Sequence, residues 1–356
     1  MTKHPVILRS ILTAAVLSAA AAAPAPTPPA ATAPDISTAA PGSVILPPAD
    51  ALKESPAPDK NGNFHLVPPY NPAPEDMAKD GVPTGHNFRF TMDSADSKFY
   101  PGIAKNRPGE TVPYRRQVTV YVPAQIDGTK PSPFIICQDA MQMGNLPHVL
   151  NNLIPAKRLP AMVAIFISNG GGDAQGSERG LEYDTVSGKY AEFVEAEVLP
   201  RVEQEANVKL TKDPDARCTM GQSSGAAAAF TMAWFHPELY HRVISYSGTF
   251  VNQQSPENPQ SPHGAWEYHE HLIQQADKKP IRIWMEVGSK DLRSTEAEET
   301  FHNWPLANNR MAAALKARGY DYQYIWAEGV GHVDGRMEAQ TLPEAMEWVW
   351  RGYTAK

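Results

Sequence analysis

A serine lies between two glycines in the pentapeptide GQSSG, which runs from Gly221 to Gly225. A hydrophobic strand-like run, ARCTM, leads into it, and an alanine-rich, helix-forming run, AAAAF, follows it. A sharp strand-to-helix turn of this kind exposes the serine hydroxyl and leaves room only for small neighbours. The pentapeptide alone is a weak signal. Its position between a strand and a helix is what predicts Ser223 as a nucleophile.

A serine hydroxyl becomes a strong nucleophile only when a base takes its proton and a third group orients that base. In a strand-turn-helix setting, the acid and then the histidine follow the serine along the chain. The predicted base is His332 in the loop GVGHVDG, and the predicted acid is Asp291 in VGSKD, each directly after a strand-like run. His302 is the alternative base. Other nearby acids are interpreted as surface charge: Glu296, Glu298, Glu299 and Asp334.

The tetrahedral intermediate of acyl transfer needs hydrogen-bond donors for its oxyanion. One expected donor is the backbone N–H of Ser224, the residue after the predicted nucleophile. The second is expected in the loop after the strand-like run PFIIC, where the candidates are Gln138, Asp139 and Ala140. The sequence does not choose among these three amides.

Neither the histidines nor the cysteines are spaced as metal ligands. His269 and His271 are two residues apart, which on a helix directs them to different faces. Cys137 and Cys218 each lie in a hydrophobic strand-like run, and two cysteines make no disulfide framework. We therefore expect two buried free thiols, and serine chemistry that uses no metal and no cofactor.

Strand-like and helical patterns alternate along the part of the chain that would position these residues. Several strand-like runs are apolar at both alternating positions, which is typical of strands buried on both faces. These runs cover residues 115–124, 133–139, 161–168, 216–221, 241–248, 281–288 and 322–328. Helical patterns cover residues 188–206, 225–235, 305–319 and 342–353. The alternation predicts an α/β protein with a mainly parallel sheet and helices on both faces.

The first 69 residues differ in composition from the rest of the chain. Residues 1–23 combine basic residues, a short apolar run and small residues before a predicted cleavage point near Ala23, which is typical of a signal peptide. Residues 24–69 are interpreted as a flexible linker that is rich in proline and alanine. Residues 70–356 are the predicted catalytic domain. We expect a periplasmic or secreted protein without an integral membrane segment after cleavage.

The formal net charge of −7 leaves no basic excess to neutralise phosphates, so we expect no nucleic acid partner. A content of 42% hydrophobic residues is enough for a substantial core in a chain of 356 residues. The expected partner is a small-molecule ester. The oligomeric state is left open.

The chain resembles the esterase family of α/β-hydrolases that includes esterase D, enterochelin esterase and the feruloyl and acetylxylan esterases. The resemblance extends from about Tyr70 to Tyr353 and rests on GQSSG, VGSKD and GVGHVDG, and on the longer segments LEYDTVSGKYAEFVEAEVLP and NWPLANNRMAAALKARGYDY. It implies an α/β-hydrolase fold in a single catalytic domain. The enterochelin-esterase-like branch usually has Gln-Asp-Gly at the positions where this chain has Gln138, Asp139 and Ala140. The methyl group of Ala140 therefore replaces a hydrogen atom beside the predicted oxyanion loop.

The same resemblance implies that four residues border the substrate pocket: Arg179, Glu182, Tyr183 and Trp304. The alternative is structural, with an ion pair between Arg179 and Glu182 and a core position for Trp304.

Together these observations predict an exported serine carboxylesterase that cleaves a sugar, phenolic or siderophore-type ester through an acyl-enzyme. One alternative is an acyltransferase on the same fold, which passes the acyl group to a sugar instead of water; a product assay with an added acceptor alcohol separates the two. The other is a non-catalytic binding protein that has kept the fold, and labelling with a fluorophosphonate probe separates it from an enzyme.

Overall fold

The computed structural model describes residues 1, 42–103, 109–141, 143–172 and 177–354. Apart from Met1, the predicted signal peptide lies outside these residues, as does the first part of the predicted linker, 24–41. The described residues from 42 onward belong to one compact unit.

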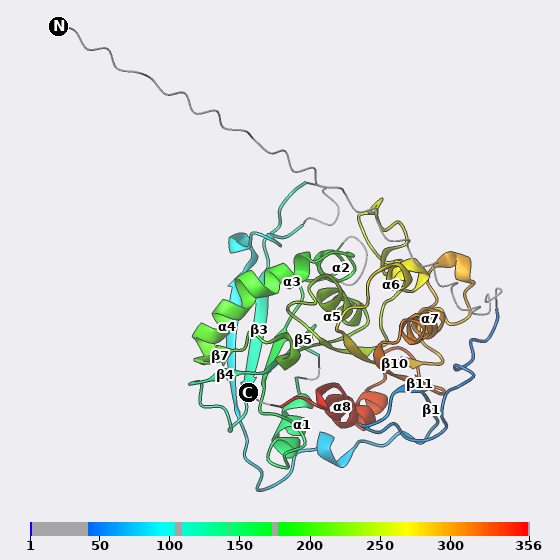
Figure 1. The fold of residues 1–356 in the computed structure, drawn as a ribbon, viewed down its shortest axis with the longest axis horizontal. Helices are drawn as coiled ribbons and strands as arrows, with labels where there is room; N and C mark the ends of the chain where they lie inside the picture. Colours follow the sequence, from blue (N-terminus) through cyan, green and yellow to red (C-terminus); the bar gives the residue numbers. More distant parts are fainter. Residues whose placement is uncertain (2–41, 104–108, 142, 173–176, 355–356) are drawn as a thin grey trace. The chain divides into compact units, whose positions relative to one another are not determined.

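A nine-stranded sheet runs through this unit in the order β1-β11-β10-β9-β8-β5-β6-β3-β2 (Figure 1). All neighbouring strands are parallel except β3, which is antiparallel to both β2 and β6. The strands are β1 (Gly62–Leu66), β2 (His86–Asp93), β3 (Arg115–Val122), β5 (Phe134–Gln138), β6 (Val163–Ile167), β8 (Arg217–Gln222), β9 (Arg242–Tyr246), β10 (Arg282–Gly288) and β11 (Asp321–Ala327). Two short strands, β4 (Pro131–Ser132) and β7 (Lys209–Leu210), pair separately.

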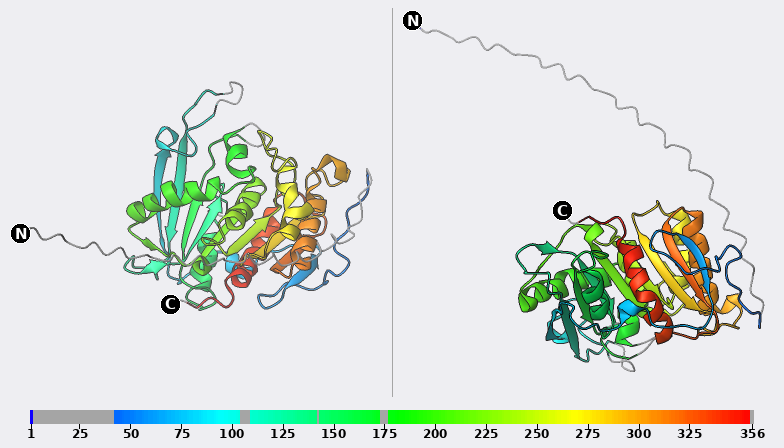
Figure 2. Two further views of the ribbon diagram at one scale, coloured as in Figure 1. Left: turned by 45° about the horizontal axis from the view of Figure 1, so that its top comes forward. Right: turned by 90° about the horizontal axis from the view of Figure 1, so that it is seen from below.

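Helices cover both faces of the sheet (Figure 2). The helices α1 (Leu146–Leu153) and α8 (Gly335–Trp350) pack on one face. The other face carries α3 (Lys189–Phe193), α4 (Leu199–Ala206), α5 (Ser224–Phe235) and α7 (Trp304–Ala317). Two further helices, α2 (Glu178–Tyr183) and α6 (Ile273–Gln275), complete the set of α-helices in the described residues. The predicted fold class, a mostly parallel sheet between two helical layers, is confirmed.

Strand β5 shows why the central strands are apolar along their whole length. Ile135 and Cys137 point into the core beneath α1 and α8, whereas Phe134 and Ile136 point into the core beneath the other helices. All four side chains are fully buried. A parallel strand covered on both faces has no position for a solvated side chain, which is the pattern that the sequence displays.

Both cysteines are buried and free, as predicted. They lie on adjacent strands, but Cys218 is in register with Ile135 and Cys137 with Met220. Burial raises the pKa of both thiols, so neither forms a thiolate readily.

The predicted end of the linker at residue 69 is wrong. Gly62–Leu66, inside the predicted linker, form β1 and pair in parallel with Gln323–Ala327 of β11. Phe64 is fully buried, and the indole N–H of Trp348 donates to the Lys60 carbonyl at 2.7 Å. Prolines and polar residues surround this five-residue strand and conceal it in the sequence, but three of its residues are buried against the sheet edge: Asn63, Phe64 and Leu66.

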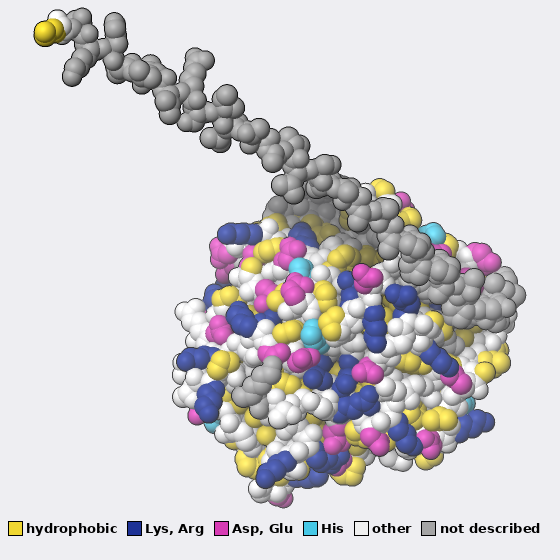
Figure 3. Space-filling model, viewed as in Figure 1, with side chains coloured by type: hydrophobic (Ala, Val, Ile, Leu, Met, Phe, Trp, Pro, Cys, Tyr) yellow, Lys and Arg dark blue, Asp and Glu magenta, His cyan; other side chains and the backbone are white. Residues whose placement is uncertain are grey.

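Figure 3 shows acidic and basic side chains interspersed over one face of the structure. Within the described ranges, no helix combines the length and the apolar character needed to cross a membrane.

Docking of β1 predicts a stability effect at Phe64. We expect Phe64→Ala to lower the free energy of unfolding by about 3–5 kcal/mol, because the substitution empties a fully buried aromatic site. Val67, directly after the strand, is 58% exposed, so Val67→Ala is the control and should change stability by less than about 0.5 kcal/mol. Chemical denaturation measures both. Equal effects would mean that β1 is not docked.

Candidate active site

Ser223 connects the end of β8 to the start of α5 in a strained conformation. Its backbone angles are φ 54° and ψ −127°, which an L-residue with a side chain rarely adopts. Two backbone hydrogen bonds hold it: Ser223 N–H donates to the Tyr246 carbonyl at 3.0 Å, and Thr249 N–H donates to the Ser223 carbonyl at 3.1 Å. The neighbouring strand β9 and the loop after it therefore fix the turn.

The two flanking glycines are required by close packing of the backbone. A Cβ atom at Gly221 would lie 2.1 Å from the backbone carbon and oxygen of Gly225. A Cβ atom at Gly225 would lie 3.0 Å from Cβ of Gln138 on β5. The turn therefore brings β8, α5 and β5 together more closely than side chains would permit.

Two hydrogen bonds connect the side chains of Ser223, His332 and Asp291 at the carboxyl ends of three strands. His332 Nε2 is 2.9 Å from Ser223 Oγ, and His332 Nδ1 is 2.6 Å from Asp291 Oδ1. Asp291 follows β10 and is buried, whereas His332 follows β11 and is partly exposed. The backbone N–H of Leu292 also donates to Asp291 Oδ1, at 2.6 Å. The Leu292 amide thus holds the carboxylate in position for its contact with the imidazole.

The alternative base, His302, has a different environment. Its Nδ1 lies 2.5 Å from the carbonyl oxygen of Thr300, and its ring is partly exposed. The structure therefore brings His332, and not His302, to the predicted nucleophile. Asp334 caps the start of α8 by accepting from Arg336 N–H at 3.0 Å.

Two buried carboxyl groups that the sequence reasoning missed lie near Asp291. Glu286 is on β10, where burial and then the charge of Asp291 raise its pKa well above the usual range. Glu338 on α8 accepts a hydrogen bond from the side chain of Gln222. The raised pKa means that Glu286 holds its proton more readily than an exposed carboxyl group, which opposes a second negative charge beside the carboxylate that contacts His332.

One predicted oxyanion donor has the expected position. Ser224 is the first residue of α5, so its backbone N–H has no partner within the helix and lies at the helix's positive end. In the loop after β5, Asp139 and Ala140 have φ of 57° and 52°. Asp139 N–H donates to Tyr183 Oη at 3.1 Å, and Ala140 N–H donates to the Ile167 carbonyl at 3.0 Å. Both amides thus have acceptors within the protein, and the second donor stays a prediction.

The left-handed backbone at residue 140 explains why glycine is usual there, because a Cβ atom disfavours positive φ. The third candidate, Gln138, is the last residue of β5, and its side-chain oxygen accepts from Tyr190 Oη at 2.7 Å.

Helix α2 holds the loop after β5. Arg179 donates to both oxygens of Asp139, with Nη2 to Oδ2 at 2.7 Å and Nε to Oδ1 at 3.1 Å. Asn169 donates to the same carboxylate at 2.6 Å. Tyr183 is 1% exposed and accepts from the Asp139 amide. Arg179 and Tyr183, which the family resemblance places at the pocket border, therefore bind the protein's own loop.

Glu182 lies in a buried ion pair and is 1% exposed. Its partner is Arg116, whose Nη1 lies 3.0 Å from Glu182 Oε2. Tyr114 Oη also donates to Glu182, at 2.9 Å. The structural alternative is therefore right about the kind of contact at Glu182 but wrong about the partner, because Arg179 pairs with Asp139.

Trp304, at the start of α7, is 3% exposed and packs beside the histidine of the site. Its ring meets the His332 ring edge-on, with centroids 6.2 Å apart. Its indole N–H donates to Thr249 Oγ1 at 3.2 Å, and that oxygen is 3.3 Å from Ser223 Oγ. Thr249, in the run SGTF after β9, was missed because a threonine after a strand is not a distinctive signal.

The side chain of Ser224 belongs to a hydrogen-bonded group of polar residues that also contains Gln253 and Asp184. The side chain of Gln253 donates to Ser224 Oγ at 3.1 Å and to Asp184 Oδ2 at 3.3 Å. Burial raises the pKa of Asp184 to about 7, against hydrogen bonds from Ser224 and Gln253 that lower it. The group connects the end of α2 to the residue that follows the predicted nucleophile.

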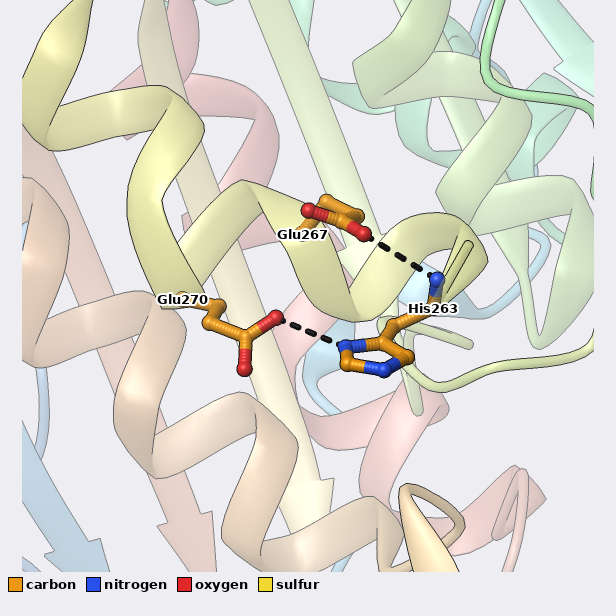
Figure 4. A group of neighbouring side chains, drawn as sticks. All are labelled: His263, Glu267 and Glu270. Carbon is orange, nitrogen blue, oxygen red and sulfur yellow. Dashed lines mark hydrogen bonds and ion pairs between the residues drawn. The ribbon is translucent and has the colours of Figure 1, made fainter. Parts of the chain in front are cut away.

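One set of described side chains has the composition of a metal site: His263, Glu267 and Glu270 (Figure 4). Glu270 Oε2 lies 2.9 Å from His263 Nδ1, and Glu267 Oε1 accepts from the His263 backbone N–H at 3.0 Å. The other Glu267 oxygen, Oε2, lies 2.8 Å from His271 Nε2. These contacts join the turn at residue 263 to the helical turn that follows it, and none of them involves the predicted triad.

Residues 109–334 match the sequence model of the family described as "Putative esterase". The chain belongs to this family. Family membership supports ester hydrolysis as the reaction class. No curated protein matches the chain.

Solved structures of esterases share the fold. The enterobactin esterase of Shigella flexneri is 17% identical with a TM-score of 0.55, and the match covers 80% of this chain and 63% of that one. The ferric enterobactin esterase of Salmonella typhimurium is 20% identical with a TM-score of 0.53, over 80% and 62% of the two chains. The ferulic acid esterase of the anaerobic fungus Anaeromyces mucronatus is 14% identical with a TM-score of 0.54, over 79% and 95%. The chain thus spans less than two thirds of the enterobactin esterases and almost all of the fungal enzyme.

The close approach at Gly221 predicts a sharp difference between two glycines. Gly221→Ala should lower stability by about 1–3 kcal/mol or more and strongly reduce activity, because its Cβ would collide with the backbone of Gly225. Gly331→Ala is the control: it lies next to His332, and its Cβ would meet only the Lys290 carbonyl oxygen, at 3.7 Å. Denaturation curves and ester turnover measure both variants. Equal tolerance would refute the tight elbow.

The buried carboxyl of Asp184 predicts a pH dependence of stability. Its folded pKa of about 7 lies above the usual 3.8, so the folded state binds an additional proton between about pH 4 and 7. Stability is therefore lost as pH rises through that window, by at most about 1.4 kcal/mol per pH unit.

We expect Asp184→Asn, which cannot ionise, to gain stability relative to the wild type from pH 5 to pH 7. Asp277→Asn, at an exposed position, is the control and should show a constant difference. Urea denaturation at pH 5, 6 and 7 measures these differences. A constant difference for Asp184→Asn as well would show that the carboxyl ionises normally.

Proposed function

We propose that the chain hydrolyses a carboxylic ester through an acyl-enzyme on Ser223, with His332 as the base and Asp291 as the group that orients it. The observation that carries this proposal is the pair of hydrogen bonds on either side of one imidazole, at 2.9 Å to Ser223 Oγ and 2.6 Å to Asp291 Oδ1. An imidazole held in this way presents Nε2 as the acceptor for the serine proton, while its Nδ1–H donates a hydrogen bond to the Asp291 carboxylate.

The first half of the reaction forms the acyl-enzyme. Ser223 Oγ attacks the ester carbonyl carbon while its proton moves to His332 Nε2. The carbonyl oxygen becomes an oxyanion, which the Ser224 amide at the start of α5 stabilises together with a second donor. The tetrahedral intermediate breaks its bond to the alcohol oxygen, and His332 gives that oxygen the proton. The alcohol departs.

Water completes the reaction. His332 takes a proton from the water, whose oxygen attacks the acyl carbon, and the second tetrahedral intermediate breaks the bond to Ser223 Oγ. His332 returns the proton to Oγ, and the acid leaves.

The substrate is proposed to be a small ester of sugar, phenolic or siderophore type. Solved neighbours of the same fold are named for enterobactin and for ferulic acid. A screen of feruloyl, acetyl-sugar and catecholate esters distinguishes these classes. We further propose that the protein is exported, with residues 1–23 removed and the folded domain in the periplasm or the medium.

The nucleophile is tested by substitution and labelling. Ser223→Ala should keep its circular dichroism spectrum and lose several orders of magnitude in turnover, with about 10³- to 10⁴-fold acceleration over water remaining. A fluorophosphonate probe should modify the wild-type protein on the peptide that contains Ser223. Turnover close to normal in a folded Ser223→Ala variant would remove this residue from the mechanism.

The base is tested with a matched pair of histidines. His332→Ala should abolish turnover, while His302→Ala should retain most of it, because only His332 contacts Ser223. The opposite ranking of the two variants would assign the base to His302.

A further inference from the structure

Thr249 contacts the reacting oxygen of the site without belonging to the triad. It lies in the loop after β9 and is 1% exposed. Its backbone N–H donates to the Ser223 carbonyl at 3.1 Å, and its Oγ1 is 3.3 Å from Ser223 Oγ. The backbone contact fixes the threonine relative to the strained turn, so the hydroxyl stays beside the nucleophile.

The direction of each hydrogen bond at this hydroxyl follows from its neighbours. Indole N–H is only a donor, so Thr249 Oγ1 must accept from Trp304, at 3.2 Å. The one proton of the threonine hydroxyl is then available for Ser223 Oγ. When the Ser223 hydroxyl donates its hydrogen bond to His332 Nε2, the donors form one directed series from Trp304 through Thr249, Ser223 and His332 to Asp291.

We infer that Thr249 is a further catalytic residue, whose hydroxyl donates to Ser223 Oγ and stabilises this oxygen as the leaving group when the acyl-enzyme is hydrolysed. This inference rests on the proposed acyl-enzyme mechanism. In deacylation the Oγ–C bond breaks and its electron pair returns to Oγ, while His332 supplies the proton. A hydrogen bond from Thr249 is strongest at that moment, because negative charge is developing on its acceptor.

The same hydrogen bond favours the two half-reactions unequally. In acylation Oγ donates electron density to the carbonyl carbon, so a donor on Oγ weakens the nucleophile even as it orients the serine proton toward His332. In deacylation the donor only helps. Removal of the hydroxyl should therefore slow the decay of the acyl-enzyme more than its formation.

Three substitutions separate the hydroxyl from its surroundings. Thr249→Val removes the hydroxyl at nearly constant shape, and Thr249→Ser keeps it. The double variant Thr249→Val with Trp304→Phe also removes the indole N–H that Thr249→Val would leave without an acceptor, which protects folding. Thr231→Val is the matched control, because Thr231 is a buried threonine bonded to Tyr268 Oη at 2.8 Å.

Both half-reactions can be measured with p-nitrophenyl acetate and an excess of enzyme. Release of p-nitrophenol gives the acylation rate, and intact-mass spectrometry of quenched samples gives the decay of the acetyl-enzyme. We expect Thr249→Val and the double variant to slow the decay roughly tenfold and to change acylation by less than about threefold. Thr249→Ser and Thr231→Val should stay within about threefold of wild type in both.

The outcomes are distinct. Equal slowing of both half-reactions, or an unchanged decay rate in both Thr249→Val variants, overturns the role of Thr249 while leaving the triad in place. Loss of the effect in the double variant alone also overturns it, since the hydroxyl is absent there too. Absence of an acetyl group on Ser223 in the wild-type protein would instead overturn the proposed function itself.

Discussion

The strained backbone at Ser223 is the constraint on which the rest of the site depends. A φ of 54° between a strand and a helix is stable only if the surroundings over-determine it. The end of β9 and the loop after it form hydrogen bonds with the backbone of Ser223. Gly221 and Gly225 also allow β5 and α5 to pack closely against the turn. The turn thus contacts β5, α5 and the loop after β9, and residues of these three elements also belong to the proposed site.

The three residues of the proposed triad and Thr249 each directly follow the carboxyl end of a strand or lie in the loop after it. Because β8, β9, β10 and β11 are parallel neighbours, their carboxyl ends meet at one edge of the sheet. Ser223 and His332 are 109 residues apart in sequence, and Asp291 and His332 are 41 apart, yet both pairs are in hydrogen-bond contact. In a parallel sheet, residues that are far apart in sequence can thus lie close together without long loops.

The sequence predicted those parts of the site that have a local signature. Ser223, Asp291 and His332 each follow a strand-like run, so their placement could be predicted, and the structure brings them together. The partner of Glu182 on helix α2 could not be predicted, because Arg116 is 66 residues away on strand β3. Thr249 was missed for a related reason, since its role depends on the indole of Trp304, 55 residues further along the chain. The seven predicted strand-like runs all became strands of the sheet, whereas the two outermost strands, β1 and β2, were missed because edge strands carry mixed polar and apolar residues.

Strand β1 also has a consequence for the order in which the molecule can be completed. Among the described residues it is the first strand along the chain, but its hydrogen-bonding partner β11 is the last, and Phe64 pairs with Ile325. The carbonyl of Pro58, just before this strand, accepts from Arg351 at the end of α8. During synthesis, β1 therefore has no partner strand on the main sheet until the residues of β11 have left the ribosome. Closure of this edge has a large loop entropy cost and belongs to the slow, late stage of folding. The segment around β1 thus stays unpaired, and accessible to a process that acts on unfolded chains such as passage through a translocation channel, until β11 is present.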